Sequence, residues 1–417
     1  MIKRIKEIVL HPLFSGSAVM IFGSNLANFI AYIYHLVIGR MLGPELYGEL
    51  AAVISLIGLL AVSFSFFGLV IVKFVSSAEG KERRMLFSWF TTKSSKIAIF
   101  VGIFVTAISP FIAGFLKIGL STAVLVGPII AVFLLSFVYS SFLQGLLRFG
   151  RLVVASNISI LGRLALGILF VALGFSVFGA IFGLLISATL GLWLNRYFLK
   201  DYKVSKDSGP RVLGKRILAY AGPIFLVSLS TNSLYSTDVI LVKHFFEAHN
   251  AGIYAALSTL GKIIFFGTAP VGAVMFPLVS QRQSQGKDYK KVFLLSLFLT
   301  LGISFLVLLV YWLMPELSLK ILYGDRFLGA SPYLVWIGLF MAIFSSGSLI
   351  AGFYLSKGDT RVWTLVVLAA LGQALGIWFF HSSIFQVITI NIISASFLLV
   401  SLLIYFGYET SKTKTKA

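Results

Sequence analysis

The sequence predicts an all-α polytopic membrane protein with twelve transmembrane helices in two six-helix lobes, which are related by a pseudo-twofold axis along the membrane normal. Three observations support this fold class. Of the 417 residues, 59% are hydrophobic and 12% are charged, whereas soluble domains carry about 25% charged residues. Apolar runs of about 20 residues, the length that crosses a bilayer, fill nearly the whole chain. The third observation is an internal repeat.

The repeat relates the beginnings of the two halves of the chain. Residues 24–58 align without a gap with residues 228–262, at an offset of 204 positions. Each copy reads as an apolar helix with a central Asn and a basic end, a short polar elbow with Gly, and a second apolar helix. We interpret the repeat as one helical hairpin used twice. The identical pairs are Ser24 with Ser228, Asn28 with Asn232, Gly48 with Gly252, Ala51-Ala52 with Ala255-Ala256, and Leu56 with Leu260.

Hydropathy divides the chain into twelve spans and two lobes. The predicted spans are 14–38, 50–75, 96–116, 121–145, 153–175, 177–198, 217–242, 251–279, 292–314, 330–355, 361–380 and 384–407. The most polar connection, residues 200–216, separates the sixth span from the seventh. We therefore expect an N-terminal six-helix lobe at 1–199, a cytoplasmic linker at 200–216 and a C-terminal six-helix lobe at 217–417. Because each lobe has an even number of spans, the two copies run in the same direction.

The distribution of basic residues predicts the orientation. With both termini in the cytoplasm, 27 of the 34 Lys and Arg residues lie in inside segments and five lie in outside loops, as the positive-inside rule requires. The same asymmetry accounts for the net charge of +20, so nucleic acid is not an expected partner. The basic segment 1–14 lacks a small-residue cleavage site, which predicts an uncleaved anchor. We expect a multi-pass protein of the cytoplasmic (inner) membrane.

Several kinds of chemistry are not supported by the residues present. The sequence contains no Cys, so disulfides and thiolate chemistry are excluded. It has no Walker motif, no H-E-x-x-H motif and no nucleophile elbow, and its five His residues are scattered. Asp238 is the single acidic residue well inside a predicted span, so a two-carboxylate active site cannot be assembled there. We expect that the protein is not an enzyme and binds no cofactor or metal.

Polar residues inside the predicted spans are the candidate site. Charges at membrane depth are costly and face a cavity or one another. One interpretation is a hydrophilic cavity between the lobes, where cations meet an anionic cargo. The alternative for Asn28 and Asn232 is hydrogen bonding between helices, and for Arg40 and Lys243 it is snorkelling to the interface. Arg163 and Lys262 lie too deep to snorkel easily, which favours the cavity.

Asp238 allows more than one interpretation. It could form an ion pair with Lys243, although a spacing of five residues suits a helix poorly, or with Lys262 on the next span. It could instead be a site for a cation or a proton.

Short motifs resemble one membrane protein family. They are Gly39–Gly48 (GRMLGPELYG), Thr237–Lys243 followed by Ala251–Ala256, and Arg148–Arg151. With these motifs the chain resembles, over essentially its full length, the polysaccharide (O-antigen type, Wzx-like) flippases. Their superfamily also contains the lipid II flippases and the multidrug and toxin extruders.

The resemblance implies a transporter that does not use ATP. It would move a polyprenyl-pyrophosphate-linked oligosaccharide from the inner to the outer leaflet by alternating access. The resemblance further implies cargo contacts at Arg40, Arg163, Lys243 and Lys262 and ion coupling through Asp238, with H+ or Na+ as the coupling ion. The expected partners are this glycan substrate and membrane lipids, and the expected state is a monomer. The first span lacks an acidic residue. Leu161-Gly162-Arg163 in the fifth span corresponds to Leu371-Gly372-Gln373 in the eleventh, so Arg163 has the neutral Gln373 as its counterpart. Any coupling machinery is therefore asymmetric or absent.

Three other functions remain open from the sequence. A multidrug exporter of the same superfamily would prefer acidic and aromatic cavity residues to the Lys and Arg found at depth. A membrane glycan polymerase or ligase would present a sizeable outside loop, whereas the longest one here covers only about Pro315 to Ala330. A scaffold without transport activity would tolerate loss of the cavity charges.

Overall fold

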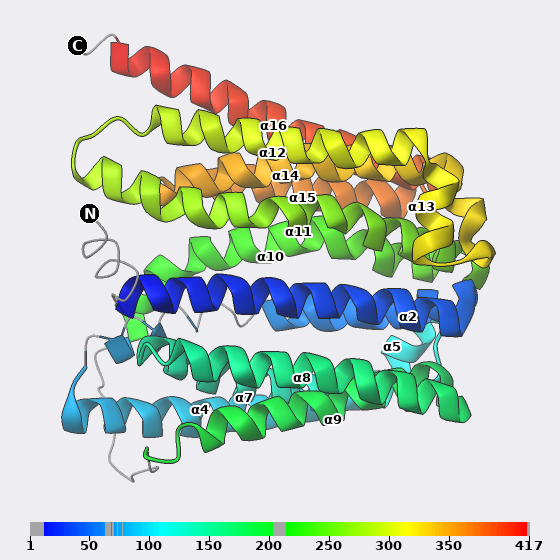
Figure 1. Cartoon of the computed structure of the whole chain (residues 1–417), viewed down its shortest axis with the longest axis horizontal. Helices are drawn as coiled ribbons and strands as arrows, with labels where there is room; N and C mark the ends of the chain where they lie inside the picture. Colours follow the sequence, from blue (N-terminus) through cyan, green and yellow to red (C-terminus); the bar gives the residue numbers. More distant parts are fainter. Residues whose placement is uncertain are drawn as a thin grey trace, which may run out of the picture. The chain divides into compact units, whose positions relative to one another are not determined.

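The computed structural model describes residues 12–62, 68, 71–72, 74–76, 78–202 and 214–414. The long elements in this part of the chain are all helices (Figure 1). Their bounds are α2 (Pro12–Val62), α4 (Gly80–Ala107), α5 (Ser109–Leu116), α6 (Leu120–Val124), α7 (Val126–Gly145), α8 (Phe149–Phe170), α9 (Ser176–Tyr197), α10 (Gly214–Phe245), α11 (Ala248–Ser284), α12 (Lys290–Leu313), α13 (Pro315–Leu322), α14 (Leu334–Ser356), α15 (Trp363–Phe379) and α16 (Ile384–Lys414).

The described residues contain ten helical stretches that are long and apolar enough to cross a membrane. Two of these, Phe22–Val62 and Phe149–Tyr197, have 41 and 49 residues, about twice the length that one crossing needs. Each is broken by a glycine with positive φ, Gly43 at 75° and Gly174 at 89°. Each break divides one long stretch into two spans, so the ten stretches correspond to twelve spans. The predicted all-α polytopic membrane fold is confirmed.

The chain divides into two compact units, Met1–Leu42 with Leu60–Gly222 and Gly43–Leu59 with Pro223–Ala417. The predicted lobes and these units differ mainly in one segment, Gly43–Leu59. The predicted N-terminal lobe includes this segment, whereas the structure groups it with the second unit. The helix breaks at Gly43, and the segment that follows packs on α11 instead. Most of the predicted linker, 203–213, and the predicted anchor at 1–11 lie outside the described residues.

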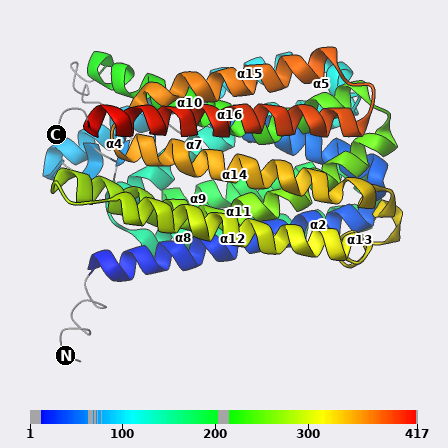
Figure 2. The same ribbon diagram turned by 90° about the horizontal axis from the view of Figure 1, so that it is seen from above.

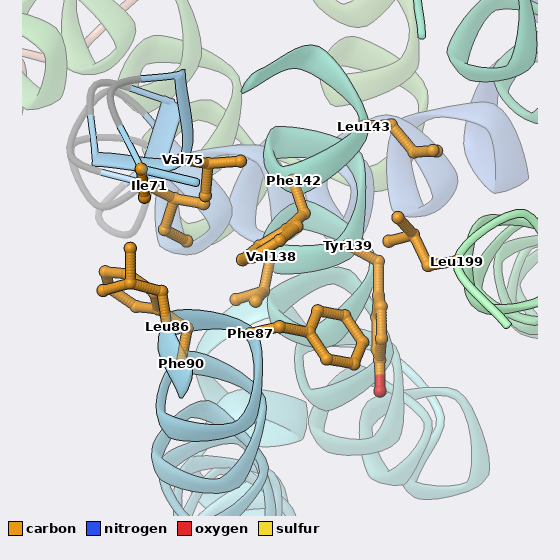
Figure 3. Close-up of a cluster of buried hydrophobic side chains, with 11 residues drawn as sticks. Ile71, Val75, Leu86, Phe87, Phe90, Val138, Tyr139, Phe142, Leu143 and Leu199 are labelled. Carbon is orange, nitrogen blue, oxygen red and sulfur yellow. The ribbon is translucent and has the colours of Figure 1, made fainter. Parts of the chain in front are cut away.

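In the first unit, small residues allow the helices to approach closely. α8 packs on α9, and a Cβ atom added at Gly183 of α9 would lie 3.0 Å from the backbone nitrogen of Gly167 in α8. α4 packs on α7 through a buried apolar cluster, in which the rings of Phe87 and Phe142 lie edge to face with centroids 5.0 Å apart (Figure 3). Such close crossings are typical of membrane helices, where packing rather than hydrophobicity drives association.

The second unit is built around α14. This helix packs on α11, α12 and α16, and Figure 2 shows it running between α16 and α12. The most apolar window of the span containing α14 is 72% buried, against 22% for α12. α14 is therefore the central helix of this unit, and α12 leaves most of its apolar surface outward, as expected for a lipid-facing helix.

The two repeat copies meet inside the second unit. A Cβ atom on Gly48 would lie 2.8 Å from the backbone nitrogen of its repeat counterpart Gly252, and one on Gly252 would collide with the carbonyl oxygen of Pro44. Glu45 also pairs with its own counterpart, His249, at 2.8 Å between Oε1 and Nδ1. The glycines at the repeated position are needed for close approach, and neither has a positive φ.

We predict that Gly252→Ala lowers the free energy of unfolding by about 1–3 kcal/mol, the range for overpacking a tight contact. The matched control is Gly302→Ala in α12, where an added Cβ meets no atom within 4 Å, and which should gain up to about 1 kcal/mol from reduced chain entropy. Unfolding of both variants in mixed detergent micelles measures the difference. If the two variants were equally stable, the backbone at Pro44 would move away from the added methyl group at little cost, which would contradict the prediction.

Candidate functional site

The predicted site residues are shared between the two units. The first unit holds Asn28, Arg40 and Arg163, and the second holds Asn232, Asp238, Lys243 and Lys262. Among the described residues, Asp238 and Arg163 are each the centre of a polar cluster, and the two clusters differ in how well their hydrogen bonds are satisfied.

The cluster of the second unit is centred on Asp238 of α10. This side chain is fully buried, and its carboxylate accepts three hydrogen bonds. The hydroxyl of Tyr254 donates to Oδ2 at 2.6 Å, Nδ2 of Asn391 donates to the same oxygen at 3.4 Å, and the backbone N–H of Val239 donates to Oδ1 at 2.8 Å. A buried carboxylate without such partners would be strongly destabilising, so these donors allow it to remain inside the helical unit.

The hydrogen bonds continue across four helices. Nδ2 of Asn391 on α16 also donates to the Tyr254 hydroxyl at 2.7 Å, and Oδ1 of Asn391 accepts from Nε2 of Gln373 on α15 at 2.8 Å. Gln373 Nε2 donates in addition to the carbonyl of Leu234 on α10 at 2.8 Å. Gln373 Oε1 is buried and has no hydrogen-bond partner within the described part of the chain.

Two members of this network, Asn391 and the hydroxyl of Tyr254, were not predicted from the sequence. Asn391 could have been recognised as a candidate, because it is an amide inside the otherwise apolar last span. Gln373 was noted only as the repeat counterpart of Arg163, although it is fully buried and bonded to both Leu234 and Asn391.

The two lysines considered as partners of Asp238 have different surroundings. Lys262 on α11 is half-buried and interacts electrostatically with the Asp238 carboxylate, and its ammonium lies 5.6 Å from the ring centroid of Tyr235. Lys243 is only 3% exposed, and its Nζ lies 3.8 Å from Oε1 of Glu49. Lys243 is therefore buried and paired with an acidic residue that the sequence analysis did not consider as its partner.

The predicted amides and Arg40 are placed as follows. Asn232 is buried, and its Oδ1 accepts from the hydroxyl of Ser236 one turn later at 2.9 Å. Asn28 and Arg40 are exposed on the part of α2 that precedes the Gly43 break. The structure thus gives Asn232 a local partner on α10 and leaves the side chain of Asn28 at the surface of its helix.

The cluster of the first unit is centred on Arg163 of α8. Its guanidinium carbon lies 4.0 Å from the ring centroid of Tyr34, a cation–π contact. Nε and Nη2 of Arg163 are buried and have no hydrogen-bond partner among the described residues. Arg163 lines a cavity of about 410 Å³ inside this unit. A guanidinium donates hydrogen bonds and accepts none, so its chemical complement is an anion.

No candidate metal centre is found among the described residues, which contain no group of three His or acidic side chains close enough to hold a metal ion.

Comparisons with known proteins agree with this fold. A family profile described as "Polysaccharide biosynthesis protein" matches residues 13–283, and the MatE profile matches residues 223–379. An inward-facing multidrug resistance MATE family transporter of the MOP superfamily has a TM-score of 0.73 at 16% identity, over 95% of this chain and 98% of that one. The lipid II flippase MurJ in an inward closed conformation has a TM-score of 0.75 at 15% identity, over 93% of this chain and 87% of its own. No curated protein sequence matches significantly.

The first profile covers well over half of the chain, which therefore belongs to the polysaccharide biosynthesis protein family. It shares its fold with the MATE transporter and with MurJ. The family resemblance that the short motifs indicated is confirmed.

We predict that Tyr254→Phe lowers the free energy of unfolding by about 1–3 kcal/mol, because it removes a short hydrogen bond to a buried carboxylate. The control is Tyr311→Phe, which removes a buried hydrogen bond of 2.8 Å to the neutral carbonyl of Leu260 and should cost about 1 kcal/mol. In an Asp238→Asn background the effect of Tyr254→Phe should shrink, which a double-mutant cycle in mixed micelles measures. Additive effects would rule out coupling between Tyr254 and Asp238.

Proposed function

We propose that the chain is a flippase that moves a polyprenyl-pyrophosphate-linked oligosaccharide across the cytoplasmic membrane by alternating access. The observation that carries the proposal is the pair of cations at membrane depth. Arg163 and Lys262 each lie 14 residues after the start of their helices, at Phe149 and Ala248, which is about 21 Å along each helix axis. Each also lies over a tyrosine ring.

The physical argument concerns the headgroup. Moving a pyrophosphate through hydrocarbon unaided is prohibitive, because a desolvated charge is far more costly than a hydrated one. Fixed cations inside a polar path lower this barrier, whereas the lipid tail stays in the bilayer. Membership of a family described by polysaccharide biosynthesis supports a lipid-linked glycan as the cargo.

Asp238 is the proposed coupling group. Its carboxylate is fully buried and interacts electrostatically with Lys262, and Gln373 Oε1 in the same network has no partner among the described residues. A carboxylate can bind and release H+ or Na+. Binding or release of the ion would change the hydrogen bonds of Tyr254 and Asn391, and with them the packing of α10, α11 and α16. We place both termini in the cytoplasm, as the positive-inside rule predicts, and propose that the protein acts as a monomer without enzymatic activity.

The second candidate is an ion-coupled multidrug exporter. The MatE match over residues 223–379 favours it, and the MATE transporter among the similar structures has the same fold. An exporter of cationic drugs would place acidic groups in its cavity. The unsatisfied donors of Arg163 point to an anionic cargo and favour the flippase.

Depletion of the protein in its host should cause accumulation of polyprenyl-pyrophosphate oligosaccharide and loss of the surface glycan, which mass spectrometry of a lipid extract detects. Complementation with Lys262→Gln should restore export at about a tenth of the normal level or less, the effect of losing one charge-assisted contact. Lys287→Gln, at an exposed position, is the matched control and should complement fully.

No accumulation on depletion, together with altered susceptibility to cationic drugs, would replace the flippase by the exporter. Full complementation by Lys262→Gln at normal protein level would remove Lys262 from the transport path.

Replacing Asp238 with Asn should make glycan export insensitive to collapse of the ion gradient, because an amide neither takes up a proton nor offers a charge to Na+. Export into inverted membrane vesicles with and without an ionophore measures this dependence. Asp288→Asn, at an exposed position, is the control and should keep the wild-type response. If Asp238→Asn remained as sensitive as the wild type, the carboxylate would be structural.

A further inference from the structure

The first unit has a cleft of about 640 Å³ where α9 ends beside α4 and α7, which we call the α9 cleft. The buried part of its lining belongs to the apolar cluster between α4 and α7 and consists of Phe87, Tyr139 and Leu199 (Figure 3). The rest of the lining comes from the last two turns of α9 and the segment that follows: Trp193, Arg196, Tyr197, Lys200 and Tyr202. The α9 cleft therefore joins an apolar interior to a basic and aromatic surface.

The segment after α9 is held against the rest of the first unit by its own contacts. The ring centroid of Tyr202 lies 5.6 Å from that of Phe87 on α4. Nη1 of Arg148 and Nη1 of Arg151 each donate a hydrogen bond of 3.1 Å to the carbonyl oxygen of Phe198. The carbonyl end of a helix carries partial negative charge that disfavours an anion. Because these two cations lie at that end of α9, they offset its effect on the α9 cleft.

The α9 cleft has two accessible cations and, among the described residues of its lining, no acidic side chain. Arg196 and Lys200 are four residues apart, and both are exposed. Asp201, the acidic residue next to them in the sequence, pairs with Arg148 instead, at 3.8 Å between Oδ2 and Nη1. The guanidinium and the ammonium donate hydrogen bonds and accept none, and the tyrosine hydroxyls of the lining can also donate. A phosphate group, which is anionic and accepts hydrogen bonds, is the complement of this set.

An exposed apolar stripe on α9 leads to the cleft. Four exposed residues at spacings of four, three and four lie on one face of the helix, and they are Ile186, Leu190, Trp193 and Tyr197. The rings of Trp193 and Tyr197 are stacked with centroids 5.7 Å apart. Between the first and the last of the four residues the helix rises about 16 Å, about half of the hydrocarbon thickness of a bilayer. The stripe thus has the length of one leaflet and ends in Trp and Tyr, the residue types enriched at membrane interfaces.

We propose that the α9 cleft binds an anionic phospholipid of the cytoplasmic leaflet, with Arg196 and Lys200 on its phosphate and one acyl chain along the stripe. A free phosphate is not the expected ligand, because exposed cations hold a soluble anion weakly, whereas the stripe offers apolar contact to a lipid. Residues 196–216 contain seven of the 34 Lys and Arg residues, so the positive-inside rule places this end of α9 at the cytoplasmic leaflet. The inference goes beyond the proposed function, because the phospholipid stays bound to the first unit and is not the molecule that is moved.

The test uses the full chain purified in a neutral detergent and titrated with dioleoyl-phosphatidylglycerol, while native mass spectrometry counts the bound lipids. This lipid should bind saturably and raise the melting temperature, because it binds the folded chain. Dioleoyl-phosphatidylcholine should bind at least about tenfold more weakly, since its choline group cancels the charge of the phosphate. The double variant Arg196→Gln with Lys200→Gln should weaken phosphatidylglycerol binding at least about tenfold. The matched control, Lys287→Gln with Lys291→Gln, removes two exposed cations four residues apart in the second unit and should bind as the wild type does.

A second variant tests the stripe without changing the charge. Trp193→Ala should weaken phosphatidylglycerol binding about threefold or more through lost apolar contact, and an unchanged melting temperature without lipid shows that the chain is folded. Equal binding of the two phospholipids, or wild-type binding by the double variant, would overturn the proposal. Displacement of phosphatidylglycerol by an equal concentration of sn-glycerol 3-phosphate would replace it with a site for soluble phosphate. Tighter binding of polyprenyl pyrophosphate through Arg196 and Lys200 would overturn it as well, because the cleft would then belong to the cargo.

Discussion

The structure depends on one constraint, that a polar group inside a hydrocarbon layer finds its partner within the protein. Asp238 meets this constraint through Tyr254, Asn391 and the backbone of Val239. Its hydrogen bonds, extended by Gln373 and Asn391, connect the consecutive helices α10 and α11 with α15 and α16, which lie more than 75 residues later in the sequence. Asp238, whose burial carries a large desolvation cost, thereby takes part in a hydrogen-bond network that links four helices.

Arg163 is the contrasting case, because its buried donors are left without a partner among the described residues. A satisfied polar network stabilises a fold, whereas an unsatisfied charge lowers stability unless a ligand completes it. The two clusters therefore differ in their contacts, because the Asp238 carboxylate is satisfied within the second unit and two buried nitrogens of Arg163 are not satisfied among the described residues. Tyr34 contacts the guanidinium of Arg163 through a cation–π interaction.

The internal repeat had a structural consequence that weak identity alone did not suggest. Gly48 and Gly252 occupy equivalent positions, and their close contact explains why both copies have a glycine there. The same contact assigns Gly43–Leu59 to the second unit. The sequence predicted the break between the first two spans but not the unit to which the second of them belongs, because that is decided by what the helix packs against.

The sequence by itself determined the membrane fold, the twelve spans, the repeat and the family, because lipid imposes a length and an apolar composition that each span carries locally. It also singled out Asp238, Arg163 and Lys262, since charges at depth are rare. Only the tertiary structure decided their partners. Lys243 pairs with Glu49, Asp238 bonds to Tyr254 and Asn391, and Arg163 lies against Tyr34 beside a serine-lined cavity. These contacts join residues that are far apart in the chain, and their geometry follows from how the helices cross.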